Sequence, residues 1–107
     1  MADDELDRLF RALADATRRD IVRRTLVGSV SVSGLAADYA MSFAAVQKHV
    51  AVLESAGLVS KIPSGRERLV RAEPEQLARA RRALAELEAI WRQRDIQLDA
   101  ILAEPEE

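Results

Sequence analysis

The chain contains no cysteine, only 4% aromatic residues, and only 4 glycines and 3 prolines among its 107 residues. Without cysteine there is no disulfide framework, no thiolate metal site and no cysteine nucleophile. No stretch approaches the roughly 18 apolar residues of a membrane helix, and the start, MADDELDRLF, lacks the basic and apolar regions of a secretion signal. We therefore expect a single domain over residues 1–107 that is soluble, cytoplasmic and without a membrane partner.

Hydrophobic residues make up 49% of the chain, and with so few aromatics the core must be built mainly from Leu, Ile, Val and Ala. At this length such a composition favours a mainly α fold over a β-sandwich. The formal net charge is -2, but residues 21–72 carry 7 basic and 3 acidic side chains between two acidic flanks. The middle of the chain is therefore basic, and its charge is hidden in the total.

Apolar residues at three- and four-residue spacing predict four helices in the first half of the chain. The first lies around Leu6 to Leu13, the second covers residues 16–26, the third runs to about Tyr39, and the fourth covers about 43–56. Asp15, Ser31 and Ser42 precede the last three helices and are typical N-caps, while Gly28 and Gly57 stand where helices end. In the second helix we expect Ile21, Val22 and Leu26 to face inward.

Two β-prone runs, LVSKI and RERLVRA, follow the fourth helix and flank Pro63-Ser64-Gly65. Proline and glycine in such a connection predict a turn, and hence a β-hairpin over residues 58–72. Pro74 then opens a long helix to about Ala103. Its apolar residues recur every seven positions, which predicts a coiled-coil-like seam interrupted by one charge at Arg94.

The helix that begins at Ser42 has two different faces. Val46, Val50 and Leu53 form an apolar stripe, and the opposite side carries Ala44, Gln47, Lys48 and Ala51. Such a slim polar face fits the major groove of DNA, where Gln pairs with adenine, Lys donates to guanine, and Ser42 can donate to a phosphate. The alternative is an ordinary solvated surface.

From about Phe10 to Leu77 the chain resembles the ArsR family of winged helix-turn-helix regulators. The resemblance rests on four segments and their spacing along about two-thirds of the chain: ALADATRRDIV (12–22), SVSGLAADYAMS (31–42), VQKHVAVLESAGLV (46–59) and SGRERLVRA (64–72). It implies a mainly α (α+β) fold with a two-stranded β-hairpin wing and a long C-terminal dimerisation helix. It also implies a homodimeric repressor that binds an inverted repeat in double-stranded DNA.

The resemblance assigns roles to residues. Residues 1–14 and 74–103 correspond to dimerisation helices, and residues 15–72 to a DNA-binding core with its wing at 58–72. Family-style DNA contacts fall on Ser42, Phe43, Gln47, Lys48, His49, Lys61, Arg66 and Arg68. The dimer interface falls on Leu6, Leu9, Phe10, Leu77, Leu84, Leu87, Trp91, Leu98 and Ile101. The apolar seam of the last helix independently requires a partner helix.

The sequence also departs from this family. The metal-binding cysteines and the paired His and carboxylates of many members are absent, so we expect no metal and no cofactor. No acid, base and nucleophile stand at a convincing spacing, which argues against an enzyme. The sequence identifies no small-molecule effector. The main alternative function is a winged-helix protein-interaction module that does not bind DNA.

Three further readings stay open at this stage. Arg18 and Arg19 either contact phosphate or are simply solvated, and Phe43 either touches a thymine methyl group or covers a neighbouring side chain. Ala40 occupies a turn position where such proteins often carry glycine, and it is strained if its φ is positive there.

Overall fold

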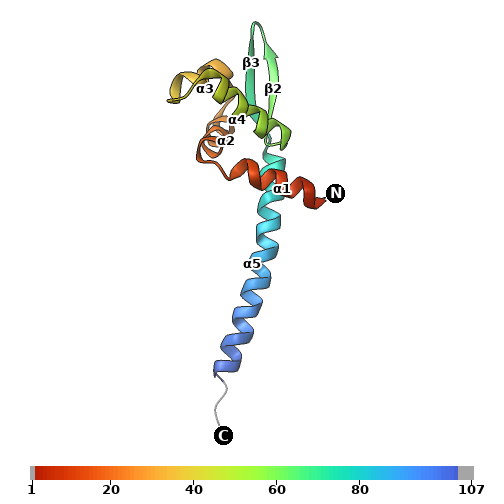
Figure 1. The fold of residues 1–107 in the computed structure, drawn as a ribbon. Coiled ribbons are helices and arrows are strands. Elements are labelled where there is room, and N and C mark those ends of the chain that lie inside the picture. The colour runs from red at the N-terminus through yellow and green to blue at the C-terminus, as the bar shows by residue number, and fades with distance from the viewer. Residues whose placement is uncertain (1, 104–107) are drawn as a thin grey trace.

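The computed structural model describes the backbone of residues 2–103 and the side-chain surroundings from residue 4 onward. It contains five helices and three strands within that range, which confirms the mainly α winged helix-turn-helix fold (Figure 1). Their order and bounds are α1 (Ala2–Leu13), α2 (Ala16–Val27), β1 (Val30–Ser31), α3 (Val32–Asp38), α4 (Phe43–Ser55), β2 (Val59–Ser64), β3 (Glu67–Ala72) and α5 (Pro74–Ala103).

The three predicted N-caps are present. The side chains of Asp15, Ser31 and Ser42 accept hydrogen bonds from the backbone N–H groups three residues further on, at 3.0, 2.9 and 3.1 Å. Each bond satisfies one of the donors that a helix start leaves without a partner. The boundaries of α2, α3 and α4 are therefore determined by local chemistry, as the sequence indicated.

The inner face of α2 differs from the expectation. Ile21 and Val22 are buried, but Leu26 is 48% exposed and Thr25 takes its place in the core at 3% exposure. At about 100° per residue, Thr25 falls between Ile21 and Val22 around the helix, whereas Leu26 lies beyond Val22. The Thr25 hydroxyl donates to the Ile21 carbonyl at 2.9 Å, so its burial leaves no polar atom without a partner.

The sheet has three strands rather than the two of the predicted hairpin. Its order is β1-β3-β2 and both pairings are antiparallel, with Val30 opposite Val70 and Val59 opposite Ala72. Val70 in the central strand is fully buried, and it anchors the base of the wing in the core. The short strand β1 was not predicted. Because it pairs with β3 and directly precedes α3, it holds the start of α3 next to the wing.

The turn of the wing is also shorter than expected. Strand β2 continues through Pro63, which lies opposite Arg68, so Pro63 belongs to a strand and not to the turn. An edge strand tolerates proline because its outer N–H has no ladder partner to lose. The turn consists of Gly65 and Arg66, and Gly65 has the positive φ of 61° that the first position of such a two-residue turn requires.

The end of α4 is a Schellman motif. The Gly57 N–H donates to the Glu54 carbonyl and the Leu58 N–H to the Leu53 carbonyl, both at 3.0 Å. Gly57 has a φ of 76°, and the Gln76 side chain of α5 donates to the Ala56 carbonyl at 2.8 Å beside it. The first turn of α5 therefore holds the end of α4.

Helix α5 extends far beyond the rest of the molecule (Figure 1). Ala80 is its only buried residue, and Arg79 attaches it to α1 through a 2.7 Å ion pair with Glu5. The radius of gyration is 19.5 Å, against about 13 Å for a compact chain of this length. No helix within residues 2–103 is both long and apolar enough to cross a membrane.

Replacing Gly57 with alanine will destabilise the protein. Alanine disfavours a φ of 76°, and the new Cβ would lie 3.1 Å from the Gln76 amide nitrogen. We expect the free energy of unfolding to fall by about 1–2 kcal/mol, measured by urea denaturation.

The matched control is Gly28→Ala, because Gly28 has an extended φ of -177° and no atom lies within 4 Å of an added Cβ. This variant should lose no more than about 0.5 kcal/mol. If both variants lost the same free energy of unfolding, neither the positive φ of Gly57 nor its contact with Gln76 would make this glycine more important than Gly28.

Candidate nucleic-acid interface

The two faces of α4 are arranged as the sequence predicted. Val46, Val50 and Leu53 are fully buried against the core. Gln47 and Lys48 are exposed on the opposite side, between the small exposed side chains of Ala44 and Ala51. The helix therefore presents a slim polar face in which Gln47 and Lys48 project between two alanines.

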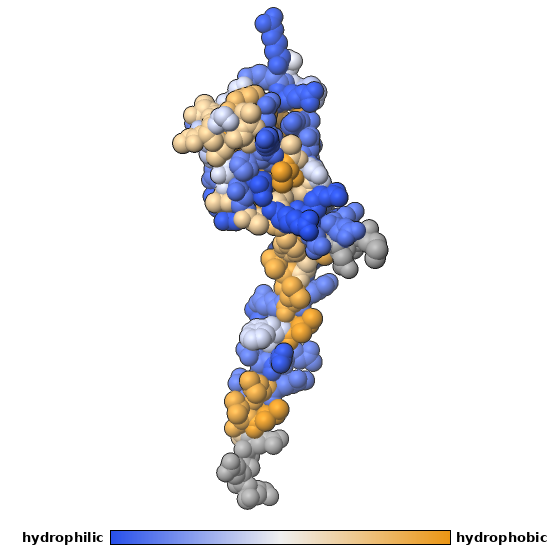
Figure 2. Space-filling model, in the orientation of Figure 1, coloured by the Kyte–Doolittle hydropathy of each residue, from blue (hydrophilic) through white to orange (hydrophobic). Residues whose placement is uncertain are grey.

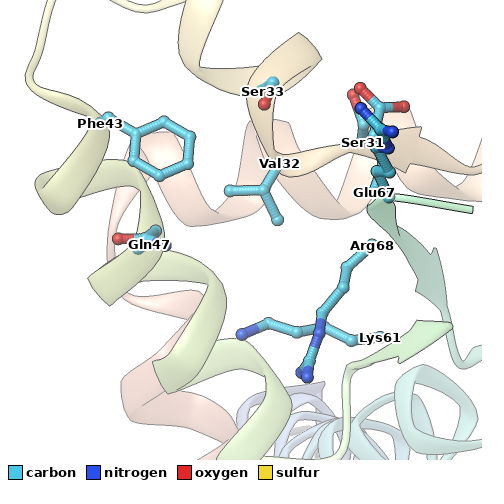
Figure 3. A pocket seen from close by; sticks show the side chains of 9 residues that line it. Ser31, Val32, Ser33, Phe43, Gln47, Lys61, Glu67 and Arg68 are labelled. Carbon is cyan, nitrogen blue, oxygen red and sulfur yellow. The ribbon is translucent and has the colours of Figure 1, made fainter. Parts of the chain in front are cut away.

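A groove of about 310 Å³ joins this face to the wing (Figure 3). Phe43 and Gln47 lie on one side, and Lys61, Arg66 and Arg68 of the wing on the other. These five residues were predicted as DNA contacts, although they come from three different segments of the chain. The groove is also lined by Ser31, Val32, Ser33 and Glu67.

Those four additional residues were missed as site residues for a structural reason. Ser31 was expected only as a helix cap, and nothing local indicates that β1 pairs with β3 and brings the start of α3 beside the wing. Phe43 points across the groove toward Val32 and Ser33 in Figure 3, and 47% of its surface is exposed. It therefore borders α3 and also offers an apolar surface to a ligand.

The basic residues of the wing differ in how far their side chains are exposed to solvent. Arg66 and Arg68 are exposed near the turn, whereas the side chain of Lys61 is only 22% exposed and its ammonium lies 3.9 Å from the Glu54 carboxylate. The two arginines can therefore follow a phosphate backbone, while Lys61 stays close to α4 at the floor of the groove. Ser42 is exposed at the N-terminus of α4, beside the groove.

His49 lies apart from these residues. It is half-buried against the corner between α1 and α2, with its Nδ1 3.4 Å from an Arg18 guanidinium nitrogen and 3.8 Å from the Asp15 carboxylate. His49, which was predicted as a DNA contact, lies outside the groove, between α4 and that corner.

The corner itself is built from arginines whose role was not foreseen. Arg18 donates to the Ala12 and Arg11 carbonyls at 2.7 and 2.9 Å, and Arg19 donates to the Leu13 carbonyl at 2.8 Å. Both side chains thus cap the C-terminus of α1, where cations are favoured. The hydrogen bond from the Arg18 backbone N–H is the main reason that the pKa of the Asp15 carboxyl is lowered.

A second polar cluster holds α3 against α2. The Tyr39 hydroxyl donates to Asp20 at 2.5 Å, and Arg24 donates to Asp38 at 2.7 Å while its guanidinium lies 5.5 Å from the Tyr39 ring centre. Burial, followed by the hydrogen bond to Asp20, raises the pKa of Tyr39. Ala40, next to this cluster, is not strained, because no non-glycine residue in the described range has a positive φ.

Helix, tight turn, helix and a basic hairpin that share one groove define the winged helix-turn-helix class of DNA-binding proteins. The comparisons with known proteins agree with this class. The chain is 41% identical over 85 residues to the HTH-type transcriptional regulator Rv2034 of Mycobacterium tuberculosis, which is 79% of this chain and 77% of that protein. No family model matches the sequence.

Solved structures give the same result. An ArsR-like transcriptional regulator from Rhodococcus sp. RHA1 is 33% identical, with a TM-score of 0.82 and 98% of both chains covered. The homodimeric winged helix-turn-helix DNA-binding domain of Mb0332 from Mycobacterium bovis shares the fold at 24% identity, with a TM-score of 0.66 and 80% of this chain and 79% of that chain covered. The protein belongs to the ArsR family of transcriptional regulators, and it is a DNA-binding regulator rather than an enzyme.

Within the residues that the structure describes, no three His, Asp or Glu side chains gather closely enough to hold a metal ion.

The cap at Asp15 makes stability depend on pH. Because its pKa is lowered in the folded state, the carboxylate contributes stability above the ordinary carboxyl pKa, and this contribution is lost as the pH falls through the lowered value. Asp15→Asn keeps a capping oxygen that does not titrate. Urea unfolding should therefore show a stability advantage of the wild type over Asp15→Asn that is constant near neutral pH and shrinks as the pH falls from about 5 to about 2.

Asp99→Asn, which changes an exposed carboxylate far along α5, serves as the control for this experiment. An advantage over Asp15→Asn that stays constant across the same pH range would contradict the assigned role of Asp15.

Proposed function

We propose that the protein is a homodimeric repressor, and that it binds an inverted-repeat operator through α4 and the wing. The observation that carries this proposal is the single groove that joins the outer face of α4 to the basic residues of the wing. One helix fits the major groove of DNA, which is about 12 Å wide, and the adjacent hairpin then meets the flanking phosphates.

Within this interface the residues have different tasks. Gln47 and Lys48 contact base edges, because their side chains offer the donor and acceptor patterns that distinguish adenine and guanine. Arg66 and Arg68 contact phosphates, and Ser42 donates to a phosphate at the N-terminus of α4. Phe43 packs against a thymine methyl group where one is present, and Lys61 supports the floor of the groove.

We propose that α1 and α5 form the dimer interface. Most of the apolar residues assigned to the interface expose surface, including Leu84, Leu87, Trp91, Leu98 and Ile101, each more than half exposed. Leu9 does not belong with them, because it is only 1% exposed and lies in the core of its own chain. Two copies related by a two-fold axis then place their recognition helices in successive major grooves, about 34 Å apart.

Repression follows from geometry, since a dimer that covers about two turns of a promoter excludes other proteins from it. Such a protein acts where the promoter DNA lies, which we take to be the cytoplasm. Residues 1–14 and 74–103 supply the dimer, and residues 15–72 supply the DNA-binding core with the wing at 58–72.

The double change Gln47→Ala and Lys48→Ala will reduce sequence preference. Loss of base contacts should lower discrimination between the operator and random DNA by about 1–3 kcal/mol for each bidentate contact removed. The measurement is a competition gel shift at fixed salt, with Gln93→Ala on the exposed side of α5 as the matched control. Unchanged discrimination would show that another surface reads the bases.

Removing Arg66 and Arg68 will change the salt dependence instead. Each phosphate contact contributes about 0.9 to the slope of log K against log salt, so the double alanine variant should lose about 2 from the slope. Arg82→Ala, an exposed arginine on α5, should leave the slope unchanged. Equal slopes for the wild type and the double variant would mean that the wing does not meet phosphate.

A further inference from the structure

The proposed dimer surface on α5 and the proposed DNA surface lie at opposite ends of the molecule. Exposed apolar side chains are concentrated on the distal part of α5 (Figure 2), whereas the wing projects at the other end, beyond α4 (Figure 1). Helix α1 lies between these surfaces, because it contacts both α4 and α5. The residues that attach α1 to α4 therefore determine how firmly the reading face is held relative to a second copy.

The side chain of Arg18 provides this attachment. Its Nε donates to the Ala12 carbonyl at 2.7 Å, one terminal nitrogen donates to the Arg11 carbonyl at 2.9 Å, and the other lies 3.4 Å from Nδ1 of His49. The two carbonyls belong to the last turn of α1, and His49 lies in the middle of α4. All three guanidinium nitrogens are thus engaged, on two helices other than the one that carries Arg18.

The shape of the guanidinium makes this link rigid. An arginine presents its N–H groups in a fixed planar fork, so the partners on α1 and α4 must keep a set distance and direction from one another. Because arginine has no acceptor, Nδ1 of His49 is the acceptor and the ring proton lies on Nε2. A lysine carries the same charge on a flexible stem, and it cannot hold three partners in one plane.

Arg18 is itself held in place by its own helix. Its backbone N–H donates to the Asp15 carboxylate at 3.0 Å, which is the N-cap bond of α2. The same carboxylate lies 3.8 Å from Nδ1 of His49, whose side chain is only 22% exposed. The helices α1, α2 and α4 therefore meet at one half-buried polar point.

Helix α4 needs an attachment at this position. Its buried apolar stripe fixes its rotation, and Gln76 holds its C-terminal end. Apolar contacts have no direction of their own, however, and packed helices slide by small amounts across them. His49 directly follows Lys48 in the sequence, so Arg18 attaches α4 beside the proposed base-reading residues.

We propose that Arg18 is a positioning residue for operator recognition. Its guanidinium holds the middle of α4 at a fixed distance and direction from α1, and in the dimer this sets the spacing of the two recognition helices. The inference rests on the proposed function, because it requires that α4 reads DNA and that α1 belongs to the dimer interface. Arg18 acts through His49 and α1, without contacting a base.

The substitution Arg18→Lys tests this role, because it keeps the charge and removes the fork. The probes are random DNA and the sequence that the wild type selects most strongly from a random pool, compared in gel shifts at fixed salt. Affinity for the selected operator should fall about three- to thirtyfold, and affinity for random DNA should change less than about twofold. Equal losses on both probes would overturn the proposal, because they indicate a phosphate contact or a loss of folded protein.

The matched control is Arg19→Lys. Among the hydrogen bonds of the described residues, Arg19 caps α1 through the Leu13 carbonyl and has no bond to α4. Its replacement should leave the affinity for both probes unchanged. A loss of operator affinity equal to that of Arg18→Lys would show that capping of α1, and not attachment of α4, is what matters.

Spacing selectivity is the readout that a merely structural role would not change. Moving the two half-sites of the selected operator closer or further apart by one base pair displaces them by about 3.4 Å. The wild type should lose affinity sharply on both altered operators, and Arg18→Lys should lose less, because its α4 is held less firmly. Equal penalties in the two proteins would refute the role of Arg18 alone, whereas a wild type that selects no DNA sequence would refute the proposed function.

Two substitutions of His49 test the contact on α4. His49→Asn places an amide oxygen at the position of Nδ1 and should keep most of the operator affinity, whereas His49→Leu has no acceptor and should resemble Arg18→Lys. The double variant of Arg18→Lys and His49→Leu should lose no more than the larger single loss, since both changes break one link. Additive losses would overturn the proposal. Each variant is measured under conditions where urea unfolding shows that it is folded.

Discussion

The burial of one apolar stripe of α4 determines what the molecule presents to a partner. Val46, Val50 and Leu53 are excluded from water, which contributes roughly 1.5–3 kcal/mol for each large side chain and fixes the rotation of the helix about its axis. Because the stripe is inward, Gln47 and Lys48 must be outward. The same core holds Leu58 and Val70, so the wing has a fixed position relative to α4.

Polar contacts then set the ends of the elements around that core. Asp15, Ser31 and Ser42 start three helices, Gly57 ends α4, and Gln76 attaches the beginning of α5 to that end. The end of α4 and the start of α5 are therefore in direct contact, although they lie far apart along the chain.

The sequence predicted well whatever depends on neighbours within about four positions. Caps, helix periodicity and the glycine after α4 are local signals, and they predicted α4 and its outward residues. Contacts between segments that are distant along the chain were harder to predict from the sequence. The pairing of β1 with β3 involves only two residues of β1, and the capping of α1 by Arg18 and Arg19 depends on how the chain turns between the helices. The residues missed in the groove, such as Ser33, belong to this second group.

Selection of bound fragments from random DNA tests the central claim most directly, because it examines binding, symmetry and spacing in one experiment. The account predicts enrichment of inverted repeats whose half-site centres lie about 10–10.5 base pairs apart. Enrichment of a single asymmetric half-site, or no enrichment at all, would contradict a dimer that presents two copies of α4 to successive major grooves.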